Sequence, residues 1–427
     1  MMLWFVLASL AHHYAPLKLR ALDVQLPELA NRLDFTDTFI AMTPVARSLS
    51  SARNVLCRLQ GSELCKPKYT RTFATQKDVK SKATKPIIFS GIQPTGQPHL
   101  GNYLGAISNW VALQEQAHLD NETLLFSIVD LHAITLPQDP IKLRKERREM
   151  AITLLACGID PKKCILFEQS RVSGHSELTW ILNCMTPVGW LTRMTQWKAK
   201  LGVARGVQSL EDASATAALK LGLLAYPVLM ASDILLYKAT KIPVGEDQIQ
   251  HLELARDIAV TFNKTVHKPF FPLPRPIITE AKRVMSLRDP SKKMSKSDKS
   301  DQSRINLVDT PEVISSKIKR AVTDSVRGIS YDRTERPAVA NLIEIYAALK
   351  RMSVEDVVKE HAESSSAVFK EALVDVLVSS LKPIQEEMAR LDKEDAYVQS
   401  VLRDGAERAS ELARPNLQEI KTLMGLC

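Results

Sequence analysis

The chain has 427 residues, of which 45% are hydrophobic and 25% are charged, and its formal net charge is +9. This length allows two or three domains with a full core. The positive charge favours a polyanionic partner, although a basic leader would also produce it. No apolar run approaches the roughly 20 residues that a membrane-spanning helix requires, so we expect a soluble protein with no membrane partner.

Cysteine usage favours a reducing compartment. The six cysteines form no C-x-x-C pair, and two of them lie within the first 65 residues. The spacing therefore indicates neither a zinc site nor a disulfide framework.

The first 85 residues differ in composition from the rest of the chain. Residues 42–62 contain three arginines, several serines and no acidic residue, which is typical of an organelle transit peptide. The stretch RTFA at 71–74 resembles a matrix-protease cleavage site, with the cut after Phe73, and residues 76–85 form a short basic linker. We therefore expect import into the mitochondrial matrix, the plastid stroma or both.

The segment Met1–Ala41 does not fit this interpretation equally well, because it carries four acidic residues that transit peptides avoid. Either Met1 or Met42 can be the natural start, and in the second case the first 41 residues are an upstream extension. The alternative for the whole leader is a disordered tail that carries no targeting signal.

From residue 86 onward, apolar β-branched segments alternate with amphipathic ones. The amphipathic segment Pro140–Cys157 is followed by Gly158 and then by Pro161, and both residue types commonly end a helix. Such alternation predicts a parallel sheet with right-handed crossovers. We expect strands at Pro86–Ile92, Thr123–Val129 and Cys164–Phe167, and helices at Gly101–Gln116 and Pro140–Cys157.

The middle and the end of the chain are predicted to be mainly helical. Ser176–Leu224 is mostly helix with a basic loop, Tyr226–Tyr237 re-enters the core, and a short strand at Ile242–Val244 precedes a helix at Gly245–Val260. After Ser300 only helices are expected. N-caps at Thr310 and Ser353 and an apolar stripe from Phe369 to Leu391, kinked at Pro383, support this expectation.

A glycine-rich stretch follows the first predicted strand. Four of the 15 glycines in the chain fall within GIQPTGQPHLGNYLG, residues 91–105. It is not a standard phosphate-binding loop, because Gln97-Pro98 stands where Lys-Ser/Thr is required. Its place between a strand and a helix is where ligands bind in open α/β sheets, and the helix N-terminus offers N–H groups to phosphate. The alternative is a tight glycine turn.

A second motif lies about 200 residues later, where Lys293–Ser297 has the sequence KMSKS. Two lysines three residues apart can neutralise a triphosphate as charge develops on its leaving group. Alone, the string could be a solvated basic run. The combination of the two motifs is far more specific than either one.

Together, Pro98–Asn102 and Lys293–Ser297 resemble the two signatures of class I aminoacyl-tRNA synthetases, and specifically of the bacterial-type tryptophanyl-tRNA synthetases. The resemblance runs from about Lys85 to the C-terminus. Asn102 replaces the second histidine of the general H-x-G-H pattern, and bacterial-type tryptophan enzymes commonly have Asn there.

The resemblance implies a Rossmann-type α/β fold. It comprises a leader and linker at 1–85 and a parallel-sheet catalytic domain at 86–300, with a helical insertion at about 176–224 and the KMSKS loop at 293–297. An all-α domain at 301–427 would bind the tRNA anticodon. Basic residues there, such as Lys317, Lys319 and Arg320, either contact RNA or form a solvated helix face.

The string YPVLMASD at 226–233 resembles the amino-acid pocket of the family. Indole has one donor and no acceptor, so a pocket that selects it needs one buried acceptor inside an apolar sleeve. Asp233 would be that acceptor, unless it is a helix cap. The residues implied to contact tryptophan are Phe89, Gly91, His132, Tyr226, Met230, Asp233, Ile242, Val244 and Gln248.

The resemblance also implies an ATP site with catalytic Lys293 and Lys296, and with Lys200 near the phosphates. His132 and Lys200 could equally be a structural histidine and a solvated lysine. Mg²⁺ would arrive with ATP as co-substrate, without a protein-bound metal. The residues implied to contact ATP are Gln93, Pro94, Thr95, Gly101, Asn102, Gly245, Glu246, Asp247, Val284, Lys293, Met294, Ser295, Lys296 and Ser297.

The implied reaction is tryptophan–tRNA ligation for organellar translation. The tryptophan carboxylate attacks the α-phosphate of ATP to give tryptophanyl-adenylate and pyrophosphate, and tryptophan then passes to the 3′ end of tRNA(Trp). The attacking carboxylate needs no catalytic base, so positioning and charge stabilisation should carry catalysis. A homodimer is implied as well.

Three other interpretations remain. A tyrosyl enzyme has the same architecture, but Met230 and Asp233 do not suit a phenol. A non-catalytic RNA-binding or regulatory descendant should have lost Gly101, Asn102 or the lysine loop, and all are intact. An unrelated nucleotidyltransferase would lack the tryptophan-pocket string and the helical C-terminal region.

Overall fold

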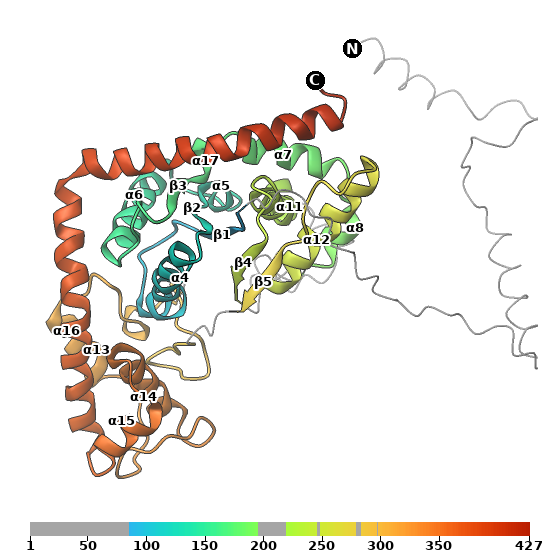
Figure 1. The fold of residues 1–427 in the computed structure, drawn as a ribbon. Coiled ribbons are helices and arrows are strands. Elements are labelled where there is room, and N and C mark those ends of the chain that lie inside the picture. The colour runs from blue at the N-terminus through green and yellow to red at the C-terminus, as the bar shows by residue number, and fades with distance from the viewer. Residues whose placement is uncertain (1–84, 195–218, 246–247, 279–282, 297) are drawn as a thin grey trace, which may run out of the picture. The chain divides into compact units, whose positions relative to one another are not determined.

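The computed structural model describes residues 85–194, 219–245, 248–278, 283–296 and 298–427 (Figure 1). These residues belong to one compact unit, 80–427. The predicted leader, its cleavage site, Lys200, Glu246, Asp247 and Ser297 lie outside the described residues. Within the described part, no helix combines the length and apolar character needed to cross a membrane.

A sheet of five parallel strands forms the centre, in the order β3-β2-β1-β4-β5 (Figure 1). This is the Rossmann order, in which the connections change direction between β1 and β4 and leave a crevice at the carboxyl ends of those strands. The strands are β1 (Ile87–Ile92), β2 (Thr123–Ile128), β3 (Ile165–Glu168), β4 (Lys241–Val244) and β5 (Arg275–Ile278).

Four of these strands match the predicted ones, and β5 was not predicted. Its sequence, RPII, follows a proline-rich segment, and proline normally argues against a strand. Because β5 lies at the edge of the sheet and pairs only with β4, Pro276 is tolerated there.

Alternate residues along the strands enter two separate cores. On one face Phe126 stacks on Trp110, with ring centroids 4.3 Å apart, under helices α4 (Ser108–Leu119) and α6 (Pro140–Ala156). On the other face Phe89 and Phe167 pack with Tyr237 against α7 (Gly174–Asn183), α11 (Leu221–Leu235) and α12 (Ile249–Thr265). The sheet is thus buried on both faces, as a parallel sheet requires.

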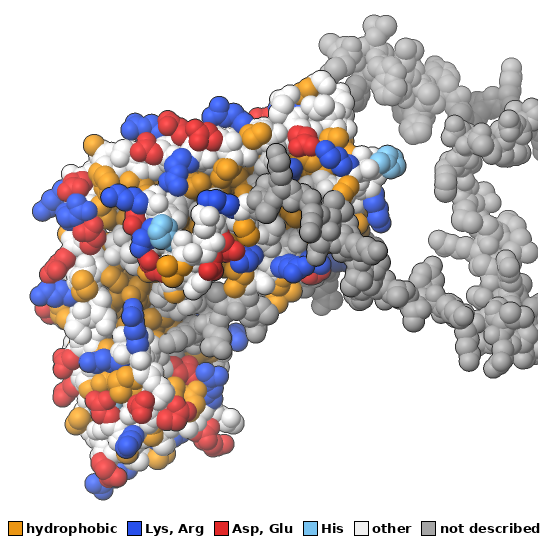
Figure 2. Space-filling view, in the orientation of Figure 1, with side chains coloured by type: hydrophobic (Ala, Val, Ile, Leu, Met, Phe, Trp, Pro, Cys, Tyr) orange, Lys and Arg blue, Asp and Glu red, His pale blue; other side chains and the backbone are white. Residues whose placement is uncertain are grey.

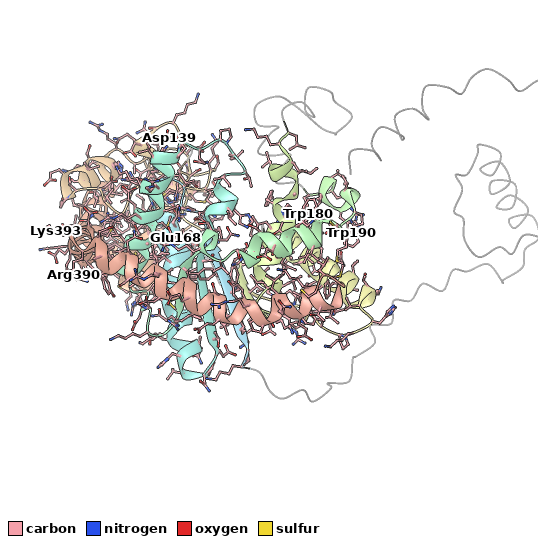
Figure 3. All side chains as sticks on the ribbon, turned by 90° about the horizontal axis from the view of Figure 1, so that it is seen from above. Asp139, Glu168, Trp180, Trp190, Arg390 and Lys393 are labelled. Atoms are coloured by element: carbon pink, nitrogen blue, oxygen red, sulfur yellow. The ribbon has the colours of Figure 1, made fainter. Side chains whose placement is uncertain are left out.

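Local signals set the limits of α6 as predicted. The Asp139 carboxylate accepts a hydrogen bond from the Lys142 N–H at 2.7 Å, Pro140 occupies the first turn, and Gly158 follows with a φ of +105°. Figure 3 labels Asp139 at this helix. The other predicted helix of this region is not regular. It consists of α3 (Leu100–Asn102), the π-helical η2 (Tyr103–Ile107) and α4. Such π-helical turns often occur at functional sites.

Helices predominate after residue 300, as predicted. Thr310 and Ser353 cap the helices that follow them, and α16 continues through Pro383 without ending. The helices here are α13 (Pro311–Lys319), α14 (Pro337–Lys350), α15 (Val354–His361), α16 (Ser366–Lys393) and α17 (Asp395–Leu423), after the short η5 (Asp301–Ser303). The remaining short helices are α5 (Asp130–Ala133), η3 (Gln169–Arg171) and α8 (Val188–Thr192). α12 begins at Ile249, four residues later than predicted.

The exposed faces of the last two helices carry mixed charge. Figure 2 shows basic and acidic side chains interspersed over the described surface. Arg390, for example, pairs with both Glu387 and Glu394. Lys317 differs from the expected solvated or RNA-contacting residue. It is only 1% exposed, and its Nζ lies 2.6 Å from carboxylate oxygens of both Asp301 and Asp309. It therefore ties α13 to the preceding segment.

Helix α17 returns to the sheet and crosses β3 (Figure 1). A Cβ atom at Gly405 would lie 1.9 Å from the carbonyl oxygen of Leu166 in β3. This approach is closer than any side chain permits, so glycine is required at this crossing.

We predict that Gly405→Ala destabilises the protein by about 3 kcal/mol, because α17 must move away from β3. In an isolated helix the same change stabilises by about 1 kcal/mol. Gly189→Ala is the control, since its Cβ would meet nothing within 4 Å. Chemical denaturation measures both variants, and equal stabilities would contradict the packing argument.

Candidate active site

The signature loop after β1 is closed by a reciprocal pair of hydrogen bonds. The Asn102 N–H donates to His99 Nδ1 at 3.3 Å, and the His99 N–H donates to Asn102 Oδ1 at 3.1 Å. Burial, then the positive charges of Lys296, Arg304 and Lys293, lower the pKa of His99 to about 4. The imidazole is therefore neutral at pH 7. Because its Nδ1 accepts a hydrogen bond, its proton lies on Nε2.

Gly101 lies in close contact with its surroundings. A Cβ there would be 3.0 Å from the imidazole of His99 and 3.6 Å from the Cβ of Met294. The glycine is thus favoured by its close approach to His99 within the signature loop itself.

The lysine loop packs on the signature loop across 200 residues of sequence. Lys296 Nζ donates to the carbonyl oxygens of Thr95 at 2.7 Å and Gly96 at 3.0 Å. Met294 is buried, and its N–H donates to the Val284 carbonyl at 3.0 Å. Burial lowers the pKa of Lys296 to about 8, against an opposing effect of Glu146.

Other predicted nucleotide residues lie around these loops. Pro94 is buried, while the side chains of Gln93 and Lys293 are exposed. Gly245 follows β4, and its carbonyl accepts the Gln248 N–H at the start of α12. Since β4 pairs with β1, this turn shares the crevice at the carboxyl ends of both strands.

A buried carboxylate lies on the other side of β1. Asp233 is 2% exposed and accepts hydrogen bonds from His132 Nε2 at 2.8 Å, Gln169 Nε2 at 2.6 Å and His175 Nδ1 at 2.7 Å. Burial raises the pKa of Asp233, but the hydrogen bonds from His132 and His175 outweigh burial, and the net pKa is lowered. Asp233 lies within α11, so it is not a helix cap.

Several apolar and aromatic residues predicted for the tryptophan pocket belong to one core cluster. Phe89 stacks on Tyr237 with ring centroids 5.8 Å apart, and Ile242 and Val244 of β4 are buried in the same cluster, against which Met230 packs. The Tyr226 hydroxyl lies 2.8 Å from His251 Nε2. Gly91 must be small, because a Cβ would lie 2.8 Å from Val129 Cγ1. The structure thus places Phe89, Tyr226, Met230, Ile242 and Val244 in or against one core cluster.

Gln169 and His175 were not predicted from the sequence. Gln169 directly follows β3, and its Oε1 accepts the Leu131 N–H at 3.1 Å while its amide donates to Asp233. A polar residue at the carboxyl end of a strand was a usable signal. His175 lies within α7 and carries no such signal, because only the packing of α7 on α11 brings it to Asp233.

The ends of β2 and β3 are joined by an ion-pair cluster. Arg147 Nη2 lies 2.8 Å from Glu168 Oε1, and Arg147 Nε lies 3.0 Å from Asp130 Oδ2. Figure 3 labels Glu168 at the end of β3. This cluster fixes the turn that carries His132 against the turn that carries Gln169. Across the described ranges, no group of three or more His, Cys, Asp or Glu side chains is arranged to hold a metal ion.

Comparison with known proteins identifies close relatives. A family model described as "tRNA synthetases class I (W and Y)" matches residues 81–382. The tryptophan–tRNA ligase of Brucella melitensis is 47% identical over 364 residues, covering 80% of this chain and 98% of its own. The tryptophan–tRNA ligase of Nostoc sp. is 48% identical over 341 residues, which cover 79% of this chain and 97% of the relative.

Solved structures agree with the sequence relatives. The tryptophanyl-tRNA synthetase of Mycoplasma pneumoniae has a TM-score of 0.69 and 36% identity, covering 81% of this chain and 99% of its own. That of Campylobacter jejuni, complexed with ADP and tryptophan, has a TM-score of 0.66 and 33% identity, covering 80% and 100%. The tyrosyl-tRNA synthetase of Aeropyrum pernix, at 17% identity, a TM-score of 0.53 and coverage of 75% and 90%, shares the fold.

The lowered pKa of Lys296 predicts a pH-dependent stability. An unfolded lysine titrates near 10.4, so between about pH 8 and pH 10 the unfolded chain binds more protons than the folded one. The free energy of unfolding of the native protein, relative to that of Lys296→Met, should therefore rise by about 1–3 kcal/mol from pH 7 to pH 10.

Urea titrations of both proteins across this range measure the difference. Lys293→Met, which removes the same charge from an exposed position of the same loop, controls for general charge effects. A constant difference between the native protein and Lys296→Met would contradict the buried position of this ammonium.

Proposed function

The chain belongs to the class I tryptophanyl-tRNA synthetases of bacterial type, and from this premise we propose that it is a tryptophan–tRNA ligase. It activates L-tryptophan with ATP and transfers the amino acid to the 3′ end of tRNA(Trp). The observation that carries the substrate assignment is Asp233, a buried acceptor whose hydrogen-bond donors include His132 and Gln169, which follow β2 and β3.

The hydrogen-bond inventory of Asp233 leaves room for one more donor. An ionised carboxylate offers about four acceptor positions, two on each oxygen. Oδ1 accepts from Gln169 and His175, whereas Oδ2 accepts from His132. One position on Oδ2 thus remains for the single N–H donor of indole. Phe89, Met230, Ile242 and Val244 supply the apolar walls.

In the activation step, an oxygen of the tryptophan carboxylate forms a bond to the α-phosphorus of ATP. The bond from that phosphorus to the bridging oxygen breaks, and pyrophosphate leaves with the electron pair. No proton has to be removed from the nucleophile, so the protein contributes position and charge. Tyr226 and Gln248 would orient the ammonium of the amino acid.

The lysine loop would stabilise the leaving pyrophosphate. The Lys296 ammonium now donates to two neutral carbonyl oxygens, and a phosphate oxygen is a stronger partner for it. Lys293, exposed in the same loop, would add a second positive charge. Lys200, outside the described residues, is proposed for the same group of phosphates.

The nucleotide itself would lie over the signature loop. Gln93, Pro94 and the backbone at Gly101 would hold it on one side, with Asn102 keeping the loop closed. Met294, Ser295 and Ser297 of the lysine loop would contact it together with Val284, and Gly245, Glu246 and Asp247 would face the ribose. Mg²⁺ would enter with ATP, as part of the co-substrate.

We propose that this ligase serves organellar translation. The arginine- and serine-rich composition of residues 42–62 and the bacterial origin of the relatives support import into mitochondria, plastids or both. A fluorescent protein fused behind residues 1–85 should enter one of these organelles, and a fusion starting at Met42 tests the second possible start. Retention of both fusions in the cytosol would contradict import.

We also propose a homodimer. Large apolar side chains are exposed on neighbouring elements of the catalytic region, including Trp180 of α7 at 71% and Leu221 of α11 at 77%. Val188 at the start of α8 is 60% exposed, and Figure 3 shows Trp180 on this part of the chain. Patches of this kind commonly mark protein interfaces. Light scattering of the purified protein should give twice the chain mass, and a monomer at micromolar concentration would contradict the proposal.

The first test is amino-acid-dependent ATP–pyrophosphate exchange by the protein starting at Ala74. Exchange should occur with tryptophan but not with tyrosine. Asp233→Asn should lower kcat/KM for tryptophan by about a hundredfold, because the amide loses the charge and turns one acceptor into a donor.

Asp139→Asn is the matched control, since the same change at the exposed start of α6 preserves a capping side chain and should leave exchange intact. Exchange supported by tyrosine would contradict the pocket assignment. Failure of the native protein to exchange with either amino acid, while it still binds tRNA, would favour the non-catalytic descendant.

A further inference from the structure

We propose that His175 is a positioning residue that determines how Asp233 presents its free acceptor position, and so contributes to selection of the indole N–H. The inference rests on the proposed function of the pocket and deepens it. It follows from a chain of buried hydrogen bonds, Tyr237–His175–Asp233, that links α7 to α11 and the residues after it.

All three side chains are removed from water. Tyr237 and His175 are 0% exposed and Asp233 is 2% exposed. His175 Nδ1 lies 2.7 Å from Asp233 Oδ1, and His175 Nε2 lies 2.8 Å from the Tyr237 hydroxyl. Polar atoms buried to this degree are costly unless each is paired, so the chain tolerates few alternative arrangements.

The direction of every proton in this chain is fixed by its two ends. An ionised carboxylate can only accept, so His175 Nδ1 must carry the proton that it donates to Asp233. In the neutral imidazole Nε2 is then an acceptor, and the Tyr237 hydroxyl donates to it. Burial keeps the pKa of Tyr237 well above its usual value, so the phenol keeps that proton.

The backbone around His175 is also held in place. The Ser232 hydroxyl of α11 donates to the His175 carbonyl at 2.8 Å, and the Thr179 hydroxyl donates to it at 2.6 Å. A Cβ at Gly174 would lie 3.3 Å from two methyl groups of Leu236, so α7 and α11 approach closely at this point. His175 is therefore clamped to the residue that precedes Asp233.

The consequence is a carboxylate with one defined open position. His175 and Gln169 fill both acceptor positions of Oδ1, and His132 fills one on Oδ2. If His175 loses its donor, Oδ1 regains an open position, and only Gln169 and His132 still hold the carboxylate. The pocket then keeps its apolar shape but no longer aims a single acceptor at the indole nitrogen.

The test compares two substrates that differ only at that nitrogen. Tryptophan is compared with β-(3-benzothienyl)alanine, in which sulfur replaces the indole N–H, by ATP–pyrophosphate exchange. His175→Leu should lower kcat/KM for tryptophan about tenfold to a hundredfold, the range for a lost hydrogen bond to a charged group, and change that for the analogue less than about threefold. His175→Asn, whose amide can take the place of Nδ1–H, should restore much of the preference for tryptophan.

Equal losses with both substrates, or no loss with either, would overturn the proposal, because a residue that only supports folding does not distinguish them. Should His175→Leu fail to fold, Tyr237→Phe removes only the hydroxyl that orients His175. This variant should lower the ratio of kcat/KM for tryptophan to that for the analogue about threefold to tenfold. An unchanged ratio of kcat/KM for tryptophan to that for the analogue in Tyr237→Phe would also overturn it. Lack of exchange by the native protein would instead refute the proposed function.

Discussion

The active region depends on the burial of one carboxylate. A charged group in an apolar core costs several kcal/mol unless donors surround it. The donors to Asp233 come from three separate elements, His132 of α5, Gln169 of η3 and His175 of α7. Two of these elements follow β2 and β3, and α7 packs on the helix that carries Asp233. The arrangement of strands and helices therefore supplies the donors that offset the free-energy cost of burying the ionised Asp233 carboxylate.

The strand order places the second half of the site beside the first. β1 runs between β2 and β4, so its middle supplies Phe89 to the pocket and its end leads into the signature loop. The two substrates of the proposed activation step would thus meet along one strand. Lys296 then joins the lysine loop to the signature loop through the carbonyl oxygens of Thr95 and Gly96.

Much of this architecture could be predicted from local sequence signals. Strands rich in β-branched residues, the Asp139 cap with Pro140, and the Thr310 and Ser353 caps each reflect interactions within a few residues. The two signature motifs indicated two loops that the structure packs together through Lys296.

What escaped prediction depends on contacts between distant segments. Strand β5 was not predicted because Pro276 argues against a strand, and the pairing of β5 with β4 could not be inferred from RPII alone. The burial of Lys317 requires Asp301 and Asp309 to be brought to it by the fold. His175 has no distinctive neighbours in sequence, and its role emerges only where α7 meets α11.

The signature loop is attached to two parts of the structure, the sheet and the helical region. It is covalently continuous with β1, yet the Leu100 N–H donates to the Ile305 carbonyl and the Leu307 N–H donates to the Pro98 carbonyl. The segment that accepts and donates these bonds is anchored to α13 through the buried Lys317. The backbone on both sides of His99 is therefore bonded to the helical region as well as continuous with the sheet, so the loop links the two.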